Sequence, residues 1–186
     1  MRRAILLGLL LLLVAAGFVG WIHYRSAAYD HWVAESAAEN GIDFYLVKAI
    51  IYEESWFRPS IRGSAGELGL MQVSMAAARD FSERKRLPPF QEAEVLEPRM
   101  NIVIGSWYLK RSLDRYKDSP APALFALLRY NAGETRANTW LQAATVKPVP
   151  LDMEPEEFYL SFVDLTRTRN YVRRILHRAR SRNFWF

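Results

Sequence analysis

The sequence predicts a mainly α-helical domain that follows an N-terminal membrane-spanning helix. Two observations favour helices: an uncharged apolar run fills the N-terminus, and later segments repeat apolar residues at helical spacing. The third observation is that strand patterns are scarce, with only a weak extended signal over residues 144–150. A chain of 186 residues without cysteine can form one ordinary core and has no disulfide to stabilise it.

Residues 1–25 read as a signal-anchor or transmembrane segment. Two arginines precede an uncharged apolar run from Ala4 to about Ile22. At about 1.5 Å per residue this run crosses a hydrocarbon core of about 30 Å. Small residues around Ala15 leave a cleaved signal peptide open as the alternative. The positive-inside bias keeps the two arginines in the cytoplasm, so the domain over residues 28–186 is expected on the other side.

The first part of the domain reads as two helices and a loop. Residues 26–41 form a short helix that ends at an Asn-Gly pair, because glycine favours the left-handed conformation that closes helices. Residues 43–55 form the second helix, with Asp43 as its N-cap. A proline and several glycines then break the periodicity, which predicts a loop over residues 59–69.

The remaining segments predict four more helices around an irregular crossover. A helix resumes over residues 70–81, and the proline-punctuated segment 82–98 reads as the crossover. Segment 100–117 is strongly amphipathic, and segment 121–133 is nearly all apolar until it stops at a glycine. The last helix, over residues 168–182, is rich in arginine.

Two adjacent glutamates at the end of helix 43–55 differ in their predicted surroundings. At about 100° per residue, Ile50, Ile51 and Glu54 fall on one stripe with Val47, whereas Glu53 falls roughly 120° away. A carboxyl group at the end of an apolar stripe loses solvation, which raises its pKa and suits a general acid. The alternative for Glu54 is a helix-end carboxylate that binds the following loop, and Glu53 is expected to be a solvated surface residue.

Four blocks of sequence occur in order between Glu54 and about Leu176. They are "ES" with the later "GLMQ", then "EPRMNIVIGSWYL", "LLRYNAGET" and "TRNYVRRIL". Together they resemble the soluble-lytic-transglycosylase (SLT) family, bacterial enzymes that cut peptidoglycan glycan strands. The resemblance implies a lysozyme-like (goose-type/SLT) helical domain over residues 28–186. With the N-terminal segment it also implies a single-pass protein of the bacterial inner (cytoplasmic) membrane whose catalytic domain lies in the periplasm.

The resemblance implies that Glu54 is the catalytic residue. The family cleaves the β-1,4 bond between N-acetylmuramic acid (MurNAc) and N-acetylglucosamine (GlcNAc) without water and leaves 1,6-anhydro-MurNAc ends. In that reaction Glu54 protonates the bridging oxygen and then deprotonates the C6 hydroxyl of the muramyl residue. The residues expected to bind substrate are Ser64, Glu67, Met71, Gln72, Tyr130 and Asn131. Packing alone is the alternative for Tyr130, and a core position with one exposed edge is the alternative for Met71.

The loop departs from the family pattern at two positions. Many members have a serine nine positions beyond the catalytic glutamate, where this chain has Gly63 with Ser64 next to it. Many also have Gly-Ala where this chain has Gly66 and Glu67. The role of the loop serine therefore falls to Ser64 or is missing, and Glu67 either lines the cleft or is a charge on an exposed loop.

Two other functions remain open at this stage. One is a goose-type-lysozyme-like muramidase that uses water, and the other is a non-catalytic peptidoglycan-binding module. Digestion of peptidoglycan distinguishes the three functions. A transglycosylase leaves anhydro ends, a muramidase leaves reducing ends, and a binding module releases no products.

Peptidoglycan glycan strands are the expected partner, and the N-terminal helix is expected to meet the membrane. No metal or cofactor is expected, because the three histidines are not grouped at any ligand spacing and no glycine-rich phosphate motif occurs. The net charge of +5 and the arginines of the last helix indicate a solvated helix face or an attraction to anionic lipid, which Phe184, Trp185 and Phe186 would share. Nucleic acid is not expected to meet an exported domain.

Overall fold

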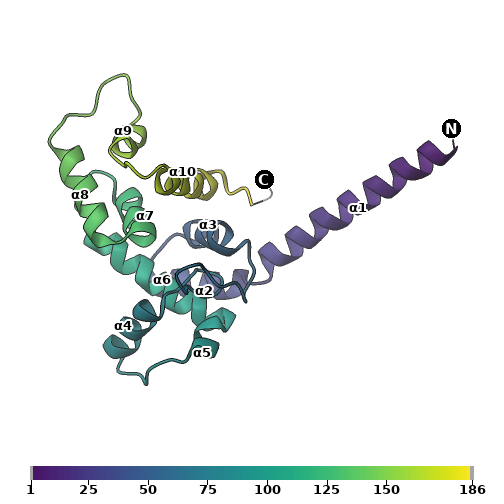
Figure 1. Ribbon diagram of the computed structural model, residues 1–186, viewed down its shortest axis with the longest axis horizontal. Coiled ribbons are helices and arrows are strands. Elements are labelled where there is room, and N and C mark those ends of the chain that lie inside the picture. Colours follow the sequence, from purple (N-terminus) through teal and green to yellow (C-terminus); the bar gives the residue numbers. More distant parts are fainter. Residues whose placement is uncertain (1, 185–186) are drawn as a thin grey trace.

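The computed structural model describes residues 2–184, and Trp185 and Phe186 lie outside the described residues. Helix α1 (Arg2–Ala27) projects from the rest of the chain as a single long rod (Figure 1). By length and composition the region Gly8–Asn40 contains one helix that could cross a membrane, and signal sequences pass the same test. The described side chains of α1 between Gly8 and Trp21 are exposed, so the rest of the described chain does not cover this apolar stretch.

Only two residues, Ala28 and Tyr29, separate helix α2 (Asp30–Asn40) from α1. Gly41 closes α2 in the left-handed conformation, with φ of 61°, and its amide bonds back to the helix as the sequence predicts. Helix α3 (Phe44–Ser55) follows at once, and the Asp43 side chain accepts a hydrogen bond of 2.8 Å from the amide of Leu46. Both caps and the second helix are confirmed, whereas the first helix starts at Asp30 and not at Ser26, because α1 continues to Ala27.

The loop after α3 is longer than the sequence predicted. Residues 56–74 hold only isolated antiparallel bridges, Arg62 with Leu68 and Leu68 with Val73. Helix α4 (Met75–Lys85) therefore begins five residues after the predicted start, with the Ser74 hydroxyl accepting from the amide of Ala77. The start at residue 70 was wrong because Leu68 and Val73 exchange backbone hydrogen bonds that a helix would need.

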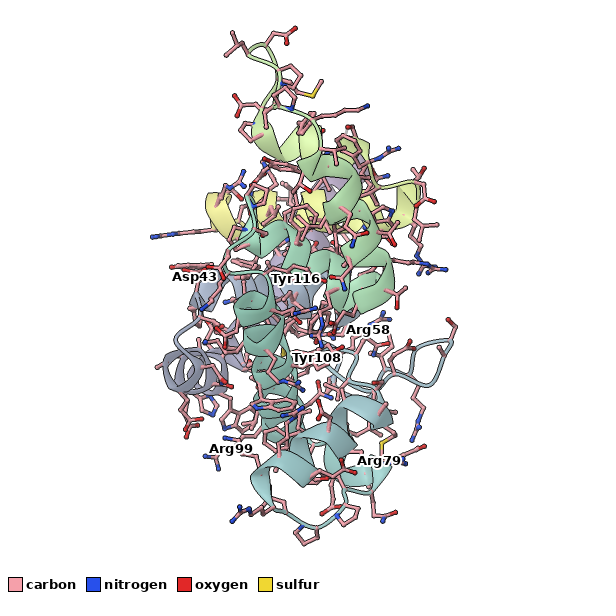
Figure 2. The ribbon with its side chains drawn as sticks, turned by 90° about the vertical axis from the view of Figure 1, so that its left-hand side faces the viewer. Asp43, Arg58, Arg79, Arg99, Tyr108 and Tyr116 are labelled. Carbon is pink, nitrogen blue, oxygen red and sulfur yellow. The ribbon has the colours of Figure 1, made fainter. Side chains whose placement is uncertain are left out.

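The predicted crossover contains a short helix, α5 (Glu92–Leu96), before α6 (Pro98–Arg115) begins. The Glu97 side chain caps α6 by accepting from two backbone amides of its first turn. Helix α6 runs through the middle of the domain and packs against α2, α4, α5 and α7 (Figure 1). Figure 2 shows Arg99 near its start, Tyr108 along its length and Tyr116 just beyond its end.

Helix α7 (Pro122–Ala132) ends at Gly133 as predicted. The next two elements, α8 (Glu134–Thr145) and α9 (Pro155–Ser161), are helices that the sequence did not predict. Helix α8 buries Ala137, Trp140 and Ala144, which are three or four positions apart, so a helical pattern exists within its polar sequence. The weak extended signal over 144–150 does not form a strand in the part of the chain that the structure describes.

Helix α10 (Thr166–Ser181) lies alongside α3 and also contacts α7, as Figure 1 shows for the two neighbouring ribbons. It buries Tyr171, Val172, Ile175 and Leu176 on one face. Its other face carries arginines, and most of them have partners within the chain. Three pair with glutamates and one lies over the ring of Tyr52: Arg173 with Glu157, Arg174 with Glu53, Arg180 with Glu156, and Arg178 at 3.6 Å from the Tyr52 centroid.

Asn101 on α6 fixes the loop to the helical core. Its buried carboxamide accepts from the Met71 amide at 2.8 Å and donates to the carbonyls of Leu68 and Val95, both at 2.8 Å. Gly69, with φ of +73°, lets the chain pass so close that a Cβ there would lie 2.6 Å from the Asn101 amide nitrogen. The "Asn" of the second sequence block therefore ties the loop to α6.

Candidate active site

The active-site candidate lies at the C-terminal end of α3, where the backbone takes an uncommon path. Trp56 and Phe57 both have positive φ, 52° and 56°, although neither is glycine. Such conformations cost of order 1–3 kcal/mol each and persist only where surrounding contacts fix them. Phe57 is buried, and the Trp56 ring stacks on Tyr52 with centroids 5.0 Å apart. The helix thus stops immediately after the two glutamates and presents them at its end.

Glu54 is held in a poorly solvated position beside a phenol. Burial, together with the negative charges of Glu53 and Glu67, raises the pKa of its carboxyl group to about 7. The hydroxyl of Tyr171 donates a hydrogen bond of 2.6 Å to Oε1 of Glu54, which favours the carboxylate and partly offsets burial. Burial and the Glu54 charge raise the pKa of Tyr171 well above its ordinary value, so this phenol keeps its proton.

Glu53 is not the solvated surface residue that the helical wheel predicted. Its side chain is 13% exposed, and Oε1 accepts from the guanidinium of Arg174, with Nε at 2.7 Å. The prediction was wrong because α10 covers this side of α3, which a wheel of one helix cannot reveal. Both residues of the pair line the same pocket as Glu54.

This pocket has a volume of about 440 Å³ and brings together most of the predicted site residues. Glu54, Ser64, Glu67, Gln72, Tyr130 and Asn131 all line it, together with Gly63, Arg167, Tyr171 and Arg174. Ser64 is exposed, and Glu67 is partly buried. The Glu67 carboxylate turns back to accept from the amide of Ala65 at 3.1 Å.

Met71 is the predicted site residue that the structure does not place in the pocket lining. Its side chain is fully buried and packs on Gly105, where a Cβ would approach the Met71 sulfur to 2.5 Å. The expectation that this side chain lines the cleft is therefore wrong: the close approach to α6 leaves it no path to the pocket. Its carbonyl oxygen instead accepts a hydrogen bond of 2.8 Å from the hydroxyl of Tyr130.

Tyr130 and Asn131 are supplied by the end of α7. The rings of Tyr130 and Tyr108 meet edge to face with centroids 5.7 Å apart. Burial and the nearby Glu54 charge raise the pKa of Tyr130 well above its ordinary value. The amide oxygen of Asn131 accepts from the hydroxyl of Thr168 on α10 at 2.8 Å, which fixes the orientation of the Asn131 side chain.

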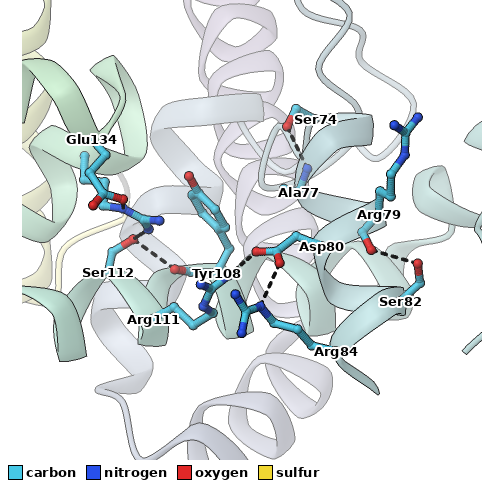
Figure 3. A network of polar contacts seen from close by, with 11 residues as sticks. Ser74, Ala77, Arg79, Asp80, Ser82, Arg84, Tyr108, Arg111, Ser112 and Glu134 are labelled. Atoms are coloured by element: carbon cyan, nitrogen blue, oxygen red, sulfur yellow. Dashed lines mark hydrogen bonds and ion pairs between the residues drawn. The ribbon is translucent and has the colours of Figure 1, made fainter. Parts of the chain in front are cut away.

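A polar network behind the pocket holds Tyr108 in place. The guanidinium of Arg129 lies 4.8 Å from the Tyr108 ring centroid, donates to the Ser112 hydroxyl at 2.6 Å and pairs with Glu134. Figure 3 shows Ser112 and Glu134 beside Tyr108.

A second ion pair joins α4 to α6 in the same region. Figure 3 shows Asp80 of α4 between Arg84 and Arg111, and both guanidinium groups pair with its carboxylate. These two positive neighbours and their hydrogen bonds lower the pKa of Asp80 despite its partial burial. Arg111 lies on α6, so the pair fixes α4 against the helix that carries Tyr108.

Sequence reasoning missed three residues of the pocket: Arg167, Tyr171 and Arg174. All three belong to α10, which was assigned as a basic helix and contains the last of the four sequence blocks, but from which no site residue was predicted. Tyr171 could have been found from its place on the apolar face of that helix, because a buried phenol needs a hydrogen-bond partner. Among residues 2–184, no group of three or more His, Asp or Glu side chains lies close enough together to hold a metal ion.

The family model and the most similar relatives that we compared all point to the same family. A family model described as "Transglycosylase SLT domain" matches residues 31–148, more than half of the chain. A putative soluble lytic murein transglycosylase of Haemophilus influenzae is 28% identical over 149 residues, which are 80% of this chain and 24% of that protein. A membrane-bound lytic murein transglycosylase F of Desulfosudis oleivorans is 28% identical over 153 residues, 81% of this chain and 31% of the relative.

Solved structures show the same fold. The 70 kDa soluble lytic transglycosylase of Escherichia coli superimposes with a TM-score of 0.69 at 24% identity, covering 81% of this chain and 23% of that protein. A complex of the 70 kDa soluble lytic transglycosylase with bulgecin A gives a TM-score of 0.72, also at 24% identity, over 82% of this chain and 23% of the other. The chain spans about a quarter to a third of the length of these relatives. It has the lysozyme-like helical fold and belongs to the transglycosylase SLT domain family.

Proposed function

We propose that the chain is a lytic transglycosylase that cleaves the MurNAc–GlcNAc β-1,4 bond of peptidoglycan and forms 1,6-anhydro-MurNAc ends. The observation that carries this proposal is the environment of Glu54: a carboxyl group with a pKa of about 7, in a pocket of about 440 Å³, beside the phenol of Tyr171. Membership of the SLT family and the names of the relatives support the same activity.

A pKa of about 7 suits a group that must first give a proton and then take one. Protonated Glu54 donates its proton to the glycosidic oxygen, and the bond from that oxygen to C1 of the muramyl residue breaks. The resulting Glu54 carboxylate accepts the proton of the C6 hydroxyl, whose oxygen bonds to C1 and closes the anhydro ring. Tyr171 occupies Oε1 throughout, which leaves Oε2 to exchange the proton.

Hydrolysis by a muramidase is the second candidate, and Glu67 is the observation that favours it. Inverting and retaining glycosidases use two carboxyl groups, and Glu67 provides a second carboxylate in the pocket of Glu54. Its carboxylate is already bonded to the amide of Ala65, which argues for a fixed role over that of a mobile base. The two reactions give different ends on the released strand.

Product analysis with two variants tests the proposal. Purified peptidoglycan is digested with the full chain in detergent, and the released muropeptides are weighed. Anhydro ends support the proposal, whereas reducing ends or the absence of products contradict it. The variant Glu54→Gln should release nothing, because the amide can neither give nor accept the proton. The matched control Glu39→Gln, at an exposed position of α2, should retain full activity.

We also propose that residues 1–25 anchor the protein in the inner membrane, with the domain of residues 28–186 in the periplasm. The apolar helix α1 supports the anchor, and membrane-bound relatives agree with it. Contact of α10 with anionic lipid has weaker support, because Arg173, Arg174 and Arg180 pair with glutamates of the chain. Recovery of the native protein in the soluble fraction would contradict the anchor.

A further inference from the structure

Two guanidinium groups of α10 line the pocket of Glu54, and they differ in their partners. Arg174 binds the carboxylate of Glu53, with Nε at 2.7 Å from Oε1. Arg167 is exposed at the second position of α10, and its guanidinium makes no hydrogen bond or ion pair with any residue that the structure describes. Among the described residues of the lining, Arg167 is therefore the cation that remains available to a ligand.

The carboxylates of the pocket leave the charge of Arg167 in place. Glu53 is paired with Arg174, and Oε2 of Glu67 accepts a hydrogen bond of 3.1 Å from a backbone amide of its own loop. The charge of Arg167 reaches Glu54, since it lowers the pKa of that carboxyl group against the effect of burial. Glu54 itself is hydrogen-bonded to a phenol, so its carboxyl group is not a fixed partner for the guanidinium.

Arg167 does not stabilise the helix that carries it. The first turn of α10 holds no acidic residue, and no side chain caps its amides. The N-terminal end of a helix dipole is positive, so a further positive charge at this end is unfavourable. A bound anion would instead be attracted by both the guanidinium and the helix end. The position therefore suits recognition of an anion better than it suits packing.

We propose that Arg167 is a specificity-determining residue that pairs with a carboxylate carried by the muramyl residues of the glycan strand. The inference rests on the proposed function for the strand itself. MurNAc and GlcNAc alternate along the strand, and only MurNAc bears a carboxyl group, on its 3-O-lactyl substituent. Where a stem peptide is attached, the lactyl group is an amide and the peptide supplies the carboxylate.

Pairing at a fixed point of the pocket sets the register of the strand. Because every second sugar carries the carboxylate, its contact with Arg167 selects the placement in which C1 of a muramyl residue, and not C1 of GlcNAc, reaches Glu54. Guanidinium groups suit this task because their planar fork matches the geometry of a carboxylate. Arg167 thus distinguishes two sugars that otherwise share the same ring and the same acetamido group.

The same pairing acts on the proton of Glu54. A bound carboxylate cancels the charge of Arg167, which favours the protonated acid that the first step requires. The phenols of Tyr130 and Tyr171 keep their protons meanwhile, because burial raises their pKa values well above the ordinary value. A strand that carries the carboxylate is therefore both bound and prepared for cleavage.

The test compares strands that differ in charge. One batch of soluble peptidoglycan strands keeps its stem peptides, and a second batch loses them to an amidase that frees the lactyl carboxylate. Half of each batch is treated with a carbodiimide and methylamine, which turn carboxylates into neutral amides. The kcat and KM of the full chain in detergent are measured on all four substrates.

The variants are Arg167→Gln and Arg167→Lys. The matched control is Arg79→Gln, which removes a guanidinium from an exposed position of α4 outside the pocket. The control should behave as the native chain does on all four substrates.

The native chain should have a KM about tenfold or more lower on untreated than on treated strands, the usual effect of a hydrogen bond to a charged group. The batch that shows this preference identifies the lactyl group or the peptide as the source of the carboxylate. Arg167→Gln should raise KM on untreated strands by a similar factor and remove the preference. Its kcat should change little, because the pairing is made equally before and during the reaction.

Arg167→Lys should keep part of the preference, because the ammonium group retains the charge but not the fork. On treated strands the alkaline limb of kcat/KM for Arg167→Gln should lie at higher pH than that of the native chain. The reason is that the variant lacks the positive charge that lowers the pKa of Glu54. A purely structural role of Arg167 would produce neither result.

Two results would overturn the proposal. One is a native chain with equal KM values on treated and untreated strands of both batches, and the other is an equal loss for Arg167→Gln on both kinds of strand. Failure of the proposed function looks different, because the chain would then release no anhydro ends. Its Glu54→Gln variant would still sediment with untreated peptidoglycan more than with treated peptidoglycan, and Arg167→Gln would remove that difference.

Discussion

At Glu54, opposing interactions act on a single proton. Burial and the charges of Glu53 and Glu67 disfavour the carboxylate, while the Tyr171 hydrogen bond and the charge of Arg167 favour it. The balance leaves the pKa at about 7, higher than that of an ordinary glutamate. An acid of this kind is protonated in mildly acidic solution and about half protonated at neutral pH, and the first step of the reaction requires the protonated form.

The pH dependence of activity follows from this balance. In the free enzyme kcat/KM should fall as the pH rises through about 7, because Glu54 then loses the proton that it must donate. Tyr171→Phe removes the hydrogen bond that favours the carboxylate, so the pKa of Glu54 rises and the alkaline limb moves to higher pH. The maximal rate should fall by about 10- to 100-fold, since the carboxylate loses its support in the second step.

The matched control for this prediction is Tyr116→Phe, which removes a hydrogen bond of 2.8 Å to Asn138 outside the pocket. Its pH profile should match that of the native protein. A Tyr171→Phe profile with an unmoved alkaline limb would show that the phenol does not act on the Glu54 proton.

The sequence predicted Glu54 better than it predicted the neighbours of Glu54. The wheel placed Glu54 on the stripe of Ile50 and Ile51 because burial within one helix is a local property. Tyr171 comes from a helix 117 positions away, so no local pattern could pair the two residues. The same distance effect misplaced Glu53, which α10 covers through Arg174.

At the scale of elements, the loop of residues 56–74 depends on α6 for its shape. The Asn101 side chain accepts a hydrogen bond from the Met71 amide and donates to the carbonyls of Leu68 and Val95. Among the described residues, no other side chain donates to these two carbonyls. Because Gln72 and the Met71 carbonyl belong to the same turn, Asn101 also fixes their position relative to α6. A loop this long without regular structure is usually functional.

Asn101→Ala should destabilise the domain by about 3 kcal/mol, because it leaves the buried Met71 amide without its partner and removes a hydrogen bond from each of the Leu68 and Val95 carbonyls. The melting temperature in detergent, followed by circular dichroism, measures the loss. The control Asn40→Ala removes one partly buried hydrogen bond to the Ser36 carbonyl and should cost about 1 kcal/mol or less. Equal shifts for the two variants would contradict the role given to Asn101.

Helices with capping residues and apolar stripes were predicted from the sequence within a few residues. The boundaries of α2, α3 and α7 follow Gly41, Asp43 and Gly133. The start of α4 was wrong because the choice between helix and loop at residues 70–74 is made by tertiary hydrogen bonds. Helices α8 and α9 were missed because their polar sequences owe their helical state to a few buried residues.

At the scale of the whole molecule, α1 and the domain are joined by a short connection. The helix continues to Ala27 and α2 begins at Asp30, so the chain between them is a turn of two residues, Ala28 and Tyr29. A membrane that holds α1 would therefore lie close to α2. This arrangement supports cleavage of glycan strands near the membrane over action throughout the wall.

The reach of the anchor can be altered without touching the pocket. A long flexible Gly/Ser insertion after Arg25 should extend cleavage in cells to strands farther from the membrane, and a version released by a cleavable signal should act throughout the wall. The measurement is the distribution of anhydro ends between newly made and old peptidoglycan, separated by pulse labelling. Equal distributions for the native protein and both altered forms would contradict this account of the anchor.

The central claim is that Glu54 accepts the proton of the C6 hydroxyl of the substrate, so that the C6 oxygen and not water attacks C1. Digestion of peptidoglycan by the native chain in water enriched in heavy oxygen tests it most directly, with mass spectrometry of the released ends. We expect every new muramyl end to carry the anhydro ring and no heavy oxygen. Heavy oxygen at C1 of new reducing ends would show that water is the nucleophile and would contradict the account.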